Sequence, residues 1–194
     1  MPASVPLSII IPVYNNAATL EAGLAPLQPL RQRGHEVLVV DGGSRDGSVT
    51  LARKLADRVL LSGTGCALQM NAGSEYASHE ILLFLPHDCR LPAQADIDVA
   101  NALDSNDAQW GHFGLQIAHG GLVGRALAML INRRASHSGA AIFEQGLFAR
   151  RQYFERVKGF DTASVPSRRL LLAAKPVRLP QAVTSLTQEC WKLW

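Results

Sequence analysis

The feature that most constrains this fold is a pair of apolar runs that each end abruptly in polar residues. The first run is LSIIIPV at residues 7–13, followed by Tyr-Asn-Asn, and the second is EVLVV at residues 36–40, followed by DGGSRDGS. Apolar residues at helical spacing come after each polar segment, so each half predicts a buried strand, a turn and a helix. Nucleotides bind at the carboxyl ends of such parallel strands. Asp41, where the second strand should stop, is therefore expected to face a site for a base, a ribose or a phosphate.

The rest of the chain continues the alternation of strands and helices. Further strands are expected at residues 58–61, 81–85 and 110–117, with two late strands at 177–179 and 183–187 separated by Pro180. Helices are expected at 17–30, from a cap at Ser44 or Asp46 to 56, and at 67–78, 93–103 and 122–134, with Pro26 and Pro29 kinking or shortening the first. Strands that alternate with helices predict an α/β fold with a mostly parallel sheet.

The composition fits a single globular domain. Of 194 residues, 47% are hydrophobic and 18% are charged, which suits one buried core. No basic segment precedes the first apolar run and no apolar stretch reaches about 18 residues, so neither a secretory signal nor a membrane-spanning helix is expected. Cys66, Cys89 and Cys190 are odd in number and far apart, which favours free thiols in a reducing cytoplasm over disulfides or zinc ligands.

Charge is distributed unevenly along the chain. Residues 1–124 carry 7 Lys and Arg against 12 Asp and Glu, whereas residues 125–194 carry 12 against 4. The basic C-terminal third allows peripheral contact with an anionic membrane, although a solvated basic face is the simpler explanation. No nucleic-acid partner is expected.

Four segments, in order along the chain, resemble one known family. They are SIIIPVYNN at residues 8–16, VVDGGSRDGS at 39–48, QMNAG at 69–73 and LFLPHDCRLP at 83–92. These motifs resemble the family 2 glycosyltransferases of the GT-A fold, and WGxF at 110–113 with GF at 159–160 narrows the likeness to a short bacterial subgroup. The resemblance implies one GT-A domain over residues 1–194, with a mostly parallel central sheet flanked by helices. Residues 1–92 would form its nucleotide-binding half and residues 93–194 a shortened acceptor-side half.

The resemblance implies inverting transfer of a sugar from a nucleoside-diphosphate sugar to an unknown acceptor. Asp88 would hold a divalent cation, Mg²⁺ or Mn²⁺, which neutralises the charge that develops on the departing diphosphate. Pro12, Tyr14 and Asp41 would line the base pocket. The other residues implied at the donor are Asn15, Gly43, Ser44, Gln69, Asn71 and His87. From the residues alone, Tyr14 could instead be a half-buried core aromatic, and Asp41 a turn former or helix cap.

The chain departs from the family pattern at the catalytic base. Inverting transfer needs an Asp or Glu that takes the proton of the acceptor hydroxyl. The family's acidic pair between GF and SRRL is absent from residues 161–170. Asp161 and Glu144 are the nearest carboxylates that could replace it, although Asp161 could be a turn former and Glu144 a solvated loop residue. Glu144, Gln145 and Trp110 would lie on the acceptor side.

Other departures leave a second function open. Related chains carry an acidic residue or His at the position of Pro86, Glu at that of Asn16, and basic residues at those of Cys66 and Leu68. The alternative is a catalytically weakened or inactive pseudo-enzyme that binds a nucleotide or nucleotide-sugar. Nucleotidyl transfer and hydride transfer are disfavoured, because no glycine-rich loop follows the first strand.

Overall fold

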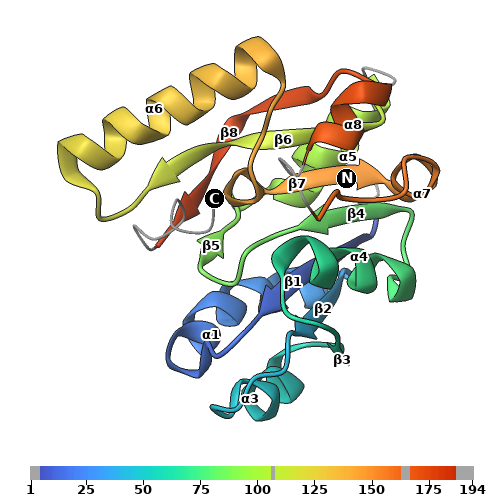
Figure 1. Cartoon of the computed structure of the whole chain (residues 1–194), viewed down its shortest axis with the longest axis vertical. Coiled ribbons are helices and arrows are strands. Elements are labelled where there is room, and N and C mark those ends of the chain that lie inside the picture. Colours follow the sequence, from blue (N-terminus) through green and yellow to red (C-terminus); the bar gives the residue numbers. More distant parts are fainter. Residues whose placement is uncertain (1–4, 106–107, 163–166, 187–194) are drawn as a thin grey trace.

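The computed structural model describes residues 5–105, 108–162 and 167–186, which form an α/β fold around one mixed sheet (Figure 1). The strands are β1 (Leu7–Val13), β2 (Glu36–Asp41), β3 (Arg58–Leu61), β4 (Ile81–Phe84), β5 (Cys89–Arg90), β6 (Trp110–Ile117), β7 (Leu147–Arg150) and β8 (Val177–Ser185). The helices are α1 (Ala17–Leu24), α2 (Gln28–Gln32), α3 (Ser48–Leu55), α4 (Cys66–Tyr76), α5 (Ala95–Ser105), α6 (Gly121–Ser138), α7 (Arg151–Arg156) and α8 (Arg168–Ala173), with 3₁₀ turns η1 (Ala25–Leu27) and η2 (Phe143–Gln145).

The sheet has the order β3-β2-β1-β4-β7-β6-β8-β5. The first four strands are parallel, whereas β7 runs antiparallel to both β4 and β6. Strand β8 is parallel to β6 and antiparallel to β5. The predicted α/β fold is confirmed, and four of these seven pairings are parallel. The parallel part is the half that places the ends of β1, β2 and β4 together.

Two apolar clusters fill the two faces of the sheet. Ile9, Ile11 and Val13 of β1 belong to one cluster, which is closed by α1, α2, α3 and α5. Ile10, from the same strand, belongs to the other, which contains residues of α4, α6, α7 and α8. Successive side chains of a strand point to opposite faces, so a strand covered by helices on both sides must be apolar throughout. This requirement explains the uninterrupted apolar run at the start of the chain.

Prolines account for two details of the secondary structure. The predicted helix at 17–30 is divided into α1, η1 and α2, with Pro26 and Pro29 each near the start of a new segment. The prediction of two late strands is wrong in the described range, because β8 runs through Pro180 without a break; residue 187 lies outside the described residues. The register between β6 and β8 shifts between His112 and Gly114, opposite the segment that holds Pro180. Irregular pairing of this kind tolerates a residue without an N–H.

Candidate active site

The carboxyl ends of β1, β2 and β4 lie side by side, because β1 pairs in parallel with both other strands. The turns after β1 and β2 are tied together by hydrogen bonds. The Asn15 N–H donates to Ser44 Oγ at 2.8 Å, and the Arg45 N–H donates back to Asn15 Oδ1 at 2.8 Å. Asn15 has a φ of 52°, in the left-handed region that Asn tolerates better than most residues. Asn15 and Ser44, both predicted at the donor, are therefore already bonded to each other across the two turns.

Asp41 ends β2 with one carboxylate oxygen engaged and the other free. Its Oδ2 accepts hydrogen bonds from the N–H groups of Gly43 and Ser44 at 2.9 and 2.8 Å. Its side chain is buried, and Oδ1 has no hydrogen-bond partner. A buried carboxylate oxygen without a partner is costly unless a ligand supplies a donor. Asp41 is thus a turn former through one oxygen and a candidate ligand contact through the other.

The remaining two residues predicted for the base pocket differ in exposure. Tyr14 is 48% exposed and belongs to neither apolar cluster, so it is half-buried but not part of the core. Pro12 is buried within β1, where it pairs with Val40. Only the aromatic ring of Tyr14 is therefore free to cover a ligand.

Gln69 and Asn71 of α4 bind backbone. Gln69 is buried, and its Nε2 donates to the carbonyls of Val13 and Val40 at 2.9 and 2.7 Å. Asn71 donates to the Phe160 carbonyl at 2.9 Å and accepts from the Phe160 N–H at 2.8 Å. These contacts join the QMNAG segment to the ends of β1 and β2 and to the GF segment. The structure thus gives Gln69 a positioning role toward the strand ends and Asn71 one toward the GF segment.

Asp88 and His87 lie in the turn between β4 and β5. The Leu186 N–H, just after β8, donates to the Asp88 carbonyl at 2.9 Å and anchors the turn. A side chain at Gly23 of α1 would collide with the His87 carbonyl, so α1 packs directly against this turn. Both residues are partly exposed. Burial lowers the pKa of His87 against the opposing effect of the Asp88 charge, so this imidazole is neutral at pH 7.

Glu144, in η2, is a buried carboxylate close to Asp88. It is 6% exposed, and its Oε2 has no hydrogen-bond partner. Burial, with a smaller contribution from the Asp88 charge, raises the pKa of Glu144 from 4.5 to about 7. Burial and the charges of the same two carboxylates raise the pKa of the Cys66 thiol at the start of α4. Cys66, Asp88 and Glu144 thus share one corner, and the interpretation of Glu144 as a solvated loop residue is wrong.

The two other residues predicted on the acceptor side lie in the core. Gln145 is fully buried, and its Nε2 lies 3.3 Å from Asn132 Oδ1 of α6. Trp110 is also fully buried, and its indole N–H donates to the Ala174 carbonyl at 2.8 Å. Either side chain would have to leave the core to touch an acceptor. Both therefore serve to hold η2 and β6 in place.

Asp161, the second candidate base, lies next to Arg169 of α8. Its Oδ1 is 3.9 Å from the guanidinium Nη2 of Arg169. It is not among the charges that act on Glu144, Cys66 or His87. The structure thus brings Glu144 close to Asp88 and places Asp161 beside Arg169.

Sequence reasoning did not assign a role to two groups near η2, the partly buried Cys66 and the buried His112. Cys66 contributes to the carboxylate corner, and its position was marked only as one where related chains carry a basic residue. His112 of β6 is buried, with Nδ1 2.8 Å from the Phe113 carbonyl and Nε2 without a partner. Burial lowers the pKa of His112, which keeps the ring neutral at pH 7. The sequence offered one indication that His112 is buried, which is its position inside an apolar strand.

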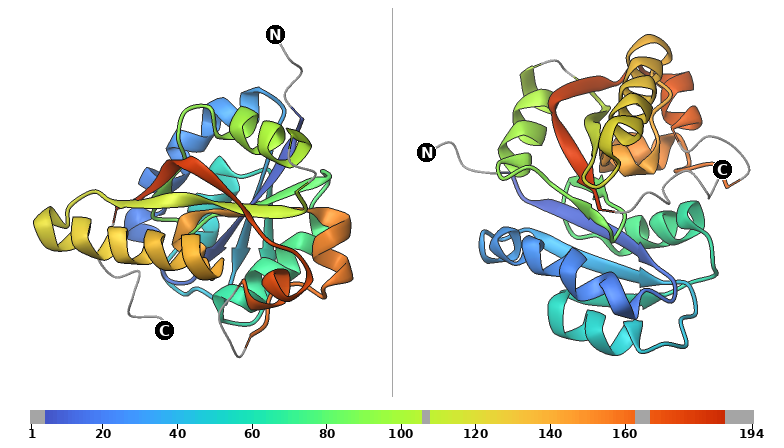
Figure 2. Two further views of the ribbon diagram at one scale, coloured as in Figure 1. Left: turned by 90° about the horizontal axis from the view of Figure 1, so that it is seen from above. Right: turned by 90° about the vertical axis from the view of Figure 1, so that its left-hand side faces the viewer.

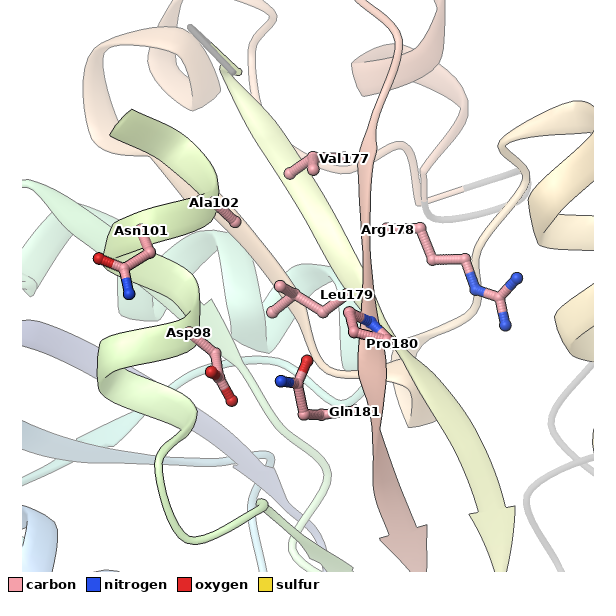
Figure 3. A pocket seen from close by; sticks show the side chains of 8 residues that line it. All are labelled: Asp98, Asn101, Ala102, Val177, Arg178, Leu179, Pro180 and Gln181. Carbon is pink, nitrogen blue, oxygen red and sulfur yellow. The ribbon is translucent and has the colours of Figure 1, made fainter. Parts of the chain in front are cut away.

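A pocket of about 290 Å³ lies elsewhere, between α5 and β8 (Figure 3). In this view the side chains of Asp98 and Gln181 point toward each other across it, while Arg178 points away. None of the residues predicted for donor, acceptor or metal lines this pocket. It is therefore distinct from the corner formed by Asp88 and Glu144.

Solved structures define the class to which this fold belongs. The mannosyltransferase PcManGT from Pyrobaculum calidifontis, in complex with GDP-Man and Mn²⁺, matches with a TM-score of 0.67 and 23% identity, over 94% of this chain and 56% of that one. S. aureus TarS 1-349, in complex with UDP-GlcNAc, matches with a TM-score of 0.71 and 16% identity, over 95% of this chain and 59% of that one. The protein has the GT-A fold of glycosyltransferases.

The sequence then identifies the family. The model of the family described as glycosyl transferase family 2 matches residues 8–156, so the chain belongs to that family. Glycosyltransferase AglE of Haloferax volcanii is 37% identical over 92 residues, which are 43% of this chain and 30% of AglE. The chain thus matches about a third of this relative and somewhat more than half of each solved structure.

Proposed function

We propose that this protein transfers a sugar, with inversion, from a nucleoside-diphosphate sugar to an acceptor hydroxyl. The observation that carries the proposal is the pairing of Asp88 with Glu144, whose burial and neighbouring charge raise its pKa to about 7. A general base is most effective when its pKa lies near the working pH. Two carboxylates in different environments can take separate catalytic roles, one facing the leaving group and the other the acceptor.

Donor binding is assigned to the ends of β1 and β2. The free Oδ1 of Asp41 would accept a hydrogen bond from the base or the ribose, and the exposed ring of Tyr14 would cover the same group. The solved relatives support this assignment, since PcManGT is in complex with GDP-Man and TarS with UDP-GlcNAc. A panel of nucleotide-sugars measures which base and which sugar this chain prefers.

A divalent cation fits the donor set at Asp88. Within residues 5–105, 108–162 and 167–186 no group of three or more His, Cys, Asp or Glu could hold a metal by itself. Mg²⁺ and Mn²⁺ in phosphate sites need only one or two carboxylates, with phosphates and waters completing the shell. Asp88 supplies one such carboxylate, which leaves Glu144 outside the shell of the ion. When bound, such an ion neutralises charge on the leaving diphosphate.

Glu144 is assigned the role of base. Its unpartnered Oε2 would accept the proton of the acceptor hydroxyl as that oxygen attacks the sugar carbon from the face opposite the diphosphate. Asp161 is less suited, because its carboxylate lies against the guanidinium of Arg169 rather than against Asp88.

The test is release of nucleoside diphosphate from a panel of UDP- and GDP-sugars with Mn²⁺. Asp88→Asn and Glu144→Gln should each lower turnover about a hundredfold or more. Asp98→Asn, a matched change in the separate α5–β8 pocket, should leave turnover unchanged. The rate of the natural chain should rise with pH through about 7 as Glu144 ionises, and Glu144→Gln should lose this rise. Full turnover by Glu144→Gln would refute its role as base.

The alternative proposal is a pseudo-enzyme that binds the donor without transferring its sugar. It is favoured by the missing acidic pair and by the deep burial of Glu144. Calorimetry with UDP, GDP and their sugars separates the two. Binding without turnover for every donor selects the pseudo-enzyme, whereas absence of binding by any nucleotide removes both proposals.

The proposed compartment is the cytoplasm. Cys66 and Cys89 are not joined to each other by a disulfide, which is typical of proteins in reducing compartments. Cell fractionation followed by thiol labelling of the two side chains tests this location, and an oxidised or secreted protein would contradict it.

A further inference from the structure

Helix α6 presents its large apolar side chains to solvent. Leu122 is 83% exposed, Val123 80%, Met129 65% and Leu130 63%. Of the nine large hydrophobic residues that are exposed in the described part of the chain, these four lie on this one helix. In Figures 1 and 2 the helix runs along the periphery of the molecule beside β6. Such a concentration marks an interaction surface, whereas single exposed apolar residues do not.

The inner side of α6 explains why these residues are not needed for folding. Gly124, Ala128 and Ala135 are the buried residues of the helix. Asn132 accepts from the N–H of Leu115 at 2.8 Å and donates to its carbonyl at 2.9 Å. Small residues and one amide thus fasten the helix to β6. The large apolar residues recur at helical spacing on the opposite side, and they contribute nothing to the core.

The charge of α6 indicates what this surface meets. Arg125, Arg133 and Arg134 are exposed, and the helix contains no acidic residue. No ion pair joins any of the three to an acidic residue of the described chain. On the helical wheel, Arg125 and Arg134 fall on either side of the apolar strip, and Arg133 lies at its C-terminal end. Long arginine side chains in these places reach headgroups while the strip enters the acyl boundary.

We propose that α6 (Gly121–Ser138) docks the protein on an anionic membrane surface, lying in the plane of the interface. At 18 residues it is the longest described helix, and no helix in the described ranges is long and apolar enough to span a bilayer. An apolar strip flanked by arginines is the pattern of helices that lie on anionic lipid. A second copy of the chain is a poorer occupant, because two such faces would bring six arginines together with no carboxylate from either helix. The inference is independent of the proposed transferase activity.

The test is flotation of the full chain with vesicles of phosphatidylcholine alone or mixed with phosphatidylglycerol. The natural chain should float with the anionic vesicles and be released by salt. Leu122→Gln with Leu130→Gln should weaken partitioning at least about tenfold, since each leucine buries its apolar surface in the lipid. Arg133→Ser with Arg134→Ser should weaken it roughly fivefold for each arginine. Leu61→Gln, at an equally exposed leucine of β3, is the matched control and should bind as the natural chain does.

Thermal unfolding of each variant checks that the fold is retained, which is expected because all five positions are exposed. Failure of the natural chain to float with anionic vesicles overturns the proposal. So does equal binding to neutral vesicles, or equal binding by the leucine variant. Sedimentation that shows a dimer abolished by Leu122→Gln with Leu130→Gln would identify a second copy as the occupant instead.

Discussion

The QMNAG segment of α4 and the η2 turn use their polar side chains in opposite ways. Gln69 and Asn71 direct their amides to backbone groups of the strand ends and of Phe160. Glu144 of η2 is buried, as Gln69 is, but keeps one carboxylate oxygen without a partner. A buried polar group that is satisfied by the fold stabilises it, whereas one left unsatisfied lowers stability unless a ligand completes it.

The comparison separates residues whose polar groups hold the fold together from residues proposed to meet the substrate. The segments that carry the family resemblance include both kinds, and their sequence spacing does not distinguish them. Asp41 shows the division within one carboxylate, since Oδ2 holds the turn and Oδ1 is free. Unsatisfied buried oxygens are therefore the better guide to chemistry in this chain.

The largest expected effect on stability concerns Gln69, whose amide is hydrogen-bonded to the backbone. Gln69→Leu removes donors to the Val13 and Val40 carbonyls and an acceptor for the Gly65 N–H. Leaving these groups short of a partner should lower the free energy of unfolding by about 3–4 kcal/mol. Chemical denaturation measures it, with the exposed Gln152→Leu of α7 as control. A loss below about 1 kcal/mol would show that the amide of Gln69 is not needed for the fold.

The second prediction concerns Glu144, whose replacement should raise the stability of the fold, and only at high pH. Between pH 4.5 and about 7 the folded state binds a proton at Glu144 that the unfolded state has lost, because burial raises the pKa of this carboxyl. Stability therefore falls as pH rises through that window, by about 3 kcal/mol in all.

Glu144→Gln is neutral at every pH and should escape this loss. It should exceed the natural chain in stability by about 3 kcal/mol at pH 8 and match it near pH 4. Denaturation midpoints at the two pH values measure the difference. The same stabilisation at both pH values would show that Glu144 does not titrate differently in the two states.

The third prediction tests the hydrogen bonds of Asn71 that link the QMNAG segment to the GF segment. Asn71→Ala removes two hydrogen bonds to the Phe160 backbone and should cost about 2 kcal/mol of unfolding free energy. Glu75→Ala, an exposed change on the same helix, should stay within about 0.5 kcal/mol. Equal stabilities of the two variants would mean that water replaces the Asn71 contacts.

Local patterns predicted the parallel half of the fold closely. The observed β1, at Leu7–Val13, and β3, at Arg58–Leu61, have the predicted bounds, because an apolar run between polar turns fixes a strand by itself. The form of β8 was predicted wrongly, since pairing with β6 carries it through Pro180. The sequence shows that a proline lacks an N–H. It does not show the irregular strand register that accommodates this proline.

The placement of Asp41 and Asp88 at the strand ends was predictable from the sequence, and the burial of Glu144 was not. Asp41 and Asp88 follow strands whose ends must meet at one edge of a parallel sheet. The burial of Glu144 depends on contacts from distant segments, such as the packing of Phe143 on Phe160 and the hydrogen bond from Ser167 to the Ala141 carbonyl. No local sequence pattern predicts such contacts, and so the raised pKa of Glu144 could not be predicted.

The smallest effect concerns the free oxygen of Asp41. Asp41→Asn can keep an oxygen toward the N–H groups of Gly43 and Ser44, and it places an amide where Oδ1 stood. Unfolding free energy should change by less than about 1 kcal/mol, because the turn retains its acceptor. Affinity for UDP or GDP should fall somewhat more than tenfold, about 1.5 kcal/mol, because the nucleotide loses a charged acceptor.

Calorimetry measures this affinity, with Asp104→Asn on the exposed side of α5 as the matched control. The two readouts together decide which role Asp41 has. Lost affinity at unchanged stability means that Oδ1 serves the ligand. Lost stability at unchanged affinity means that the carboxylate serves the turn alone, and then a buried oxygen without a partner is no guide to the donor site.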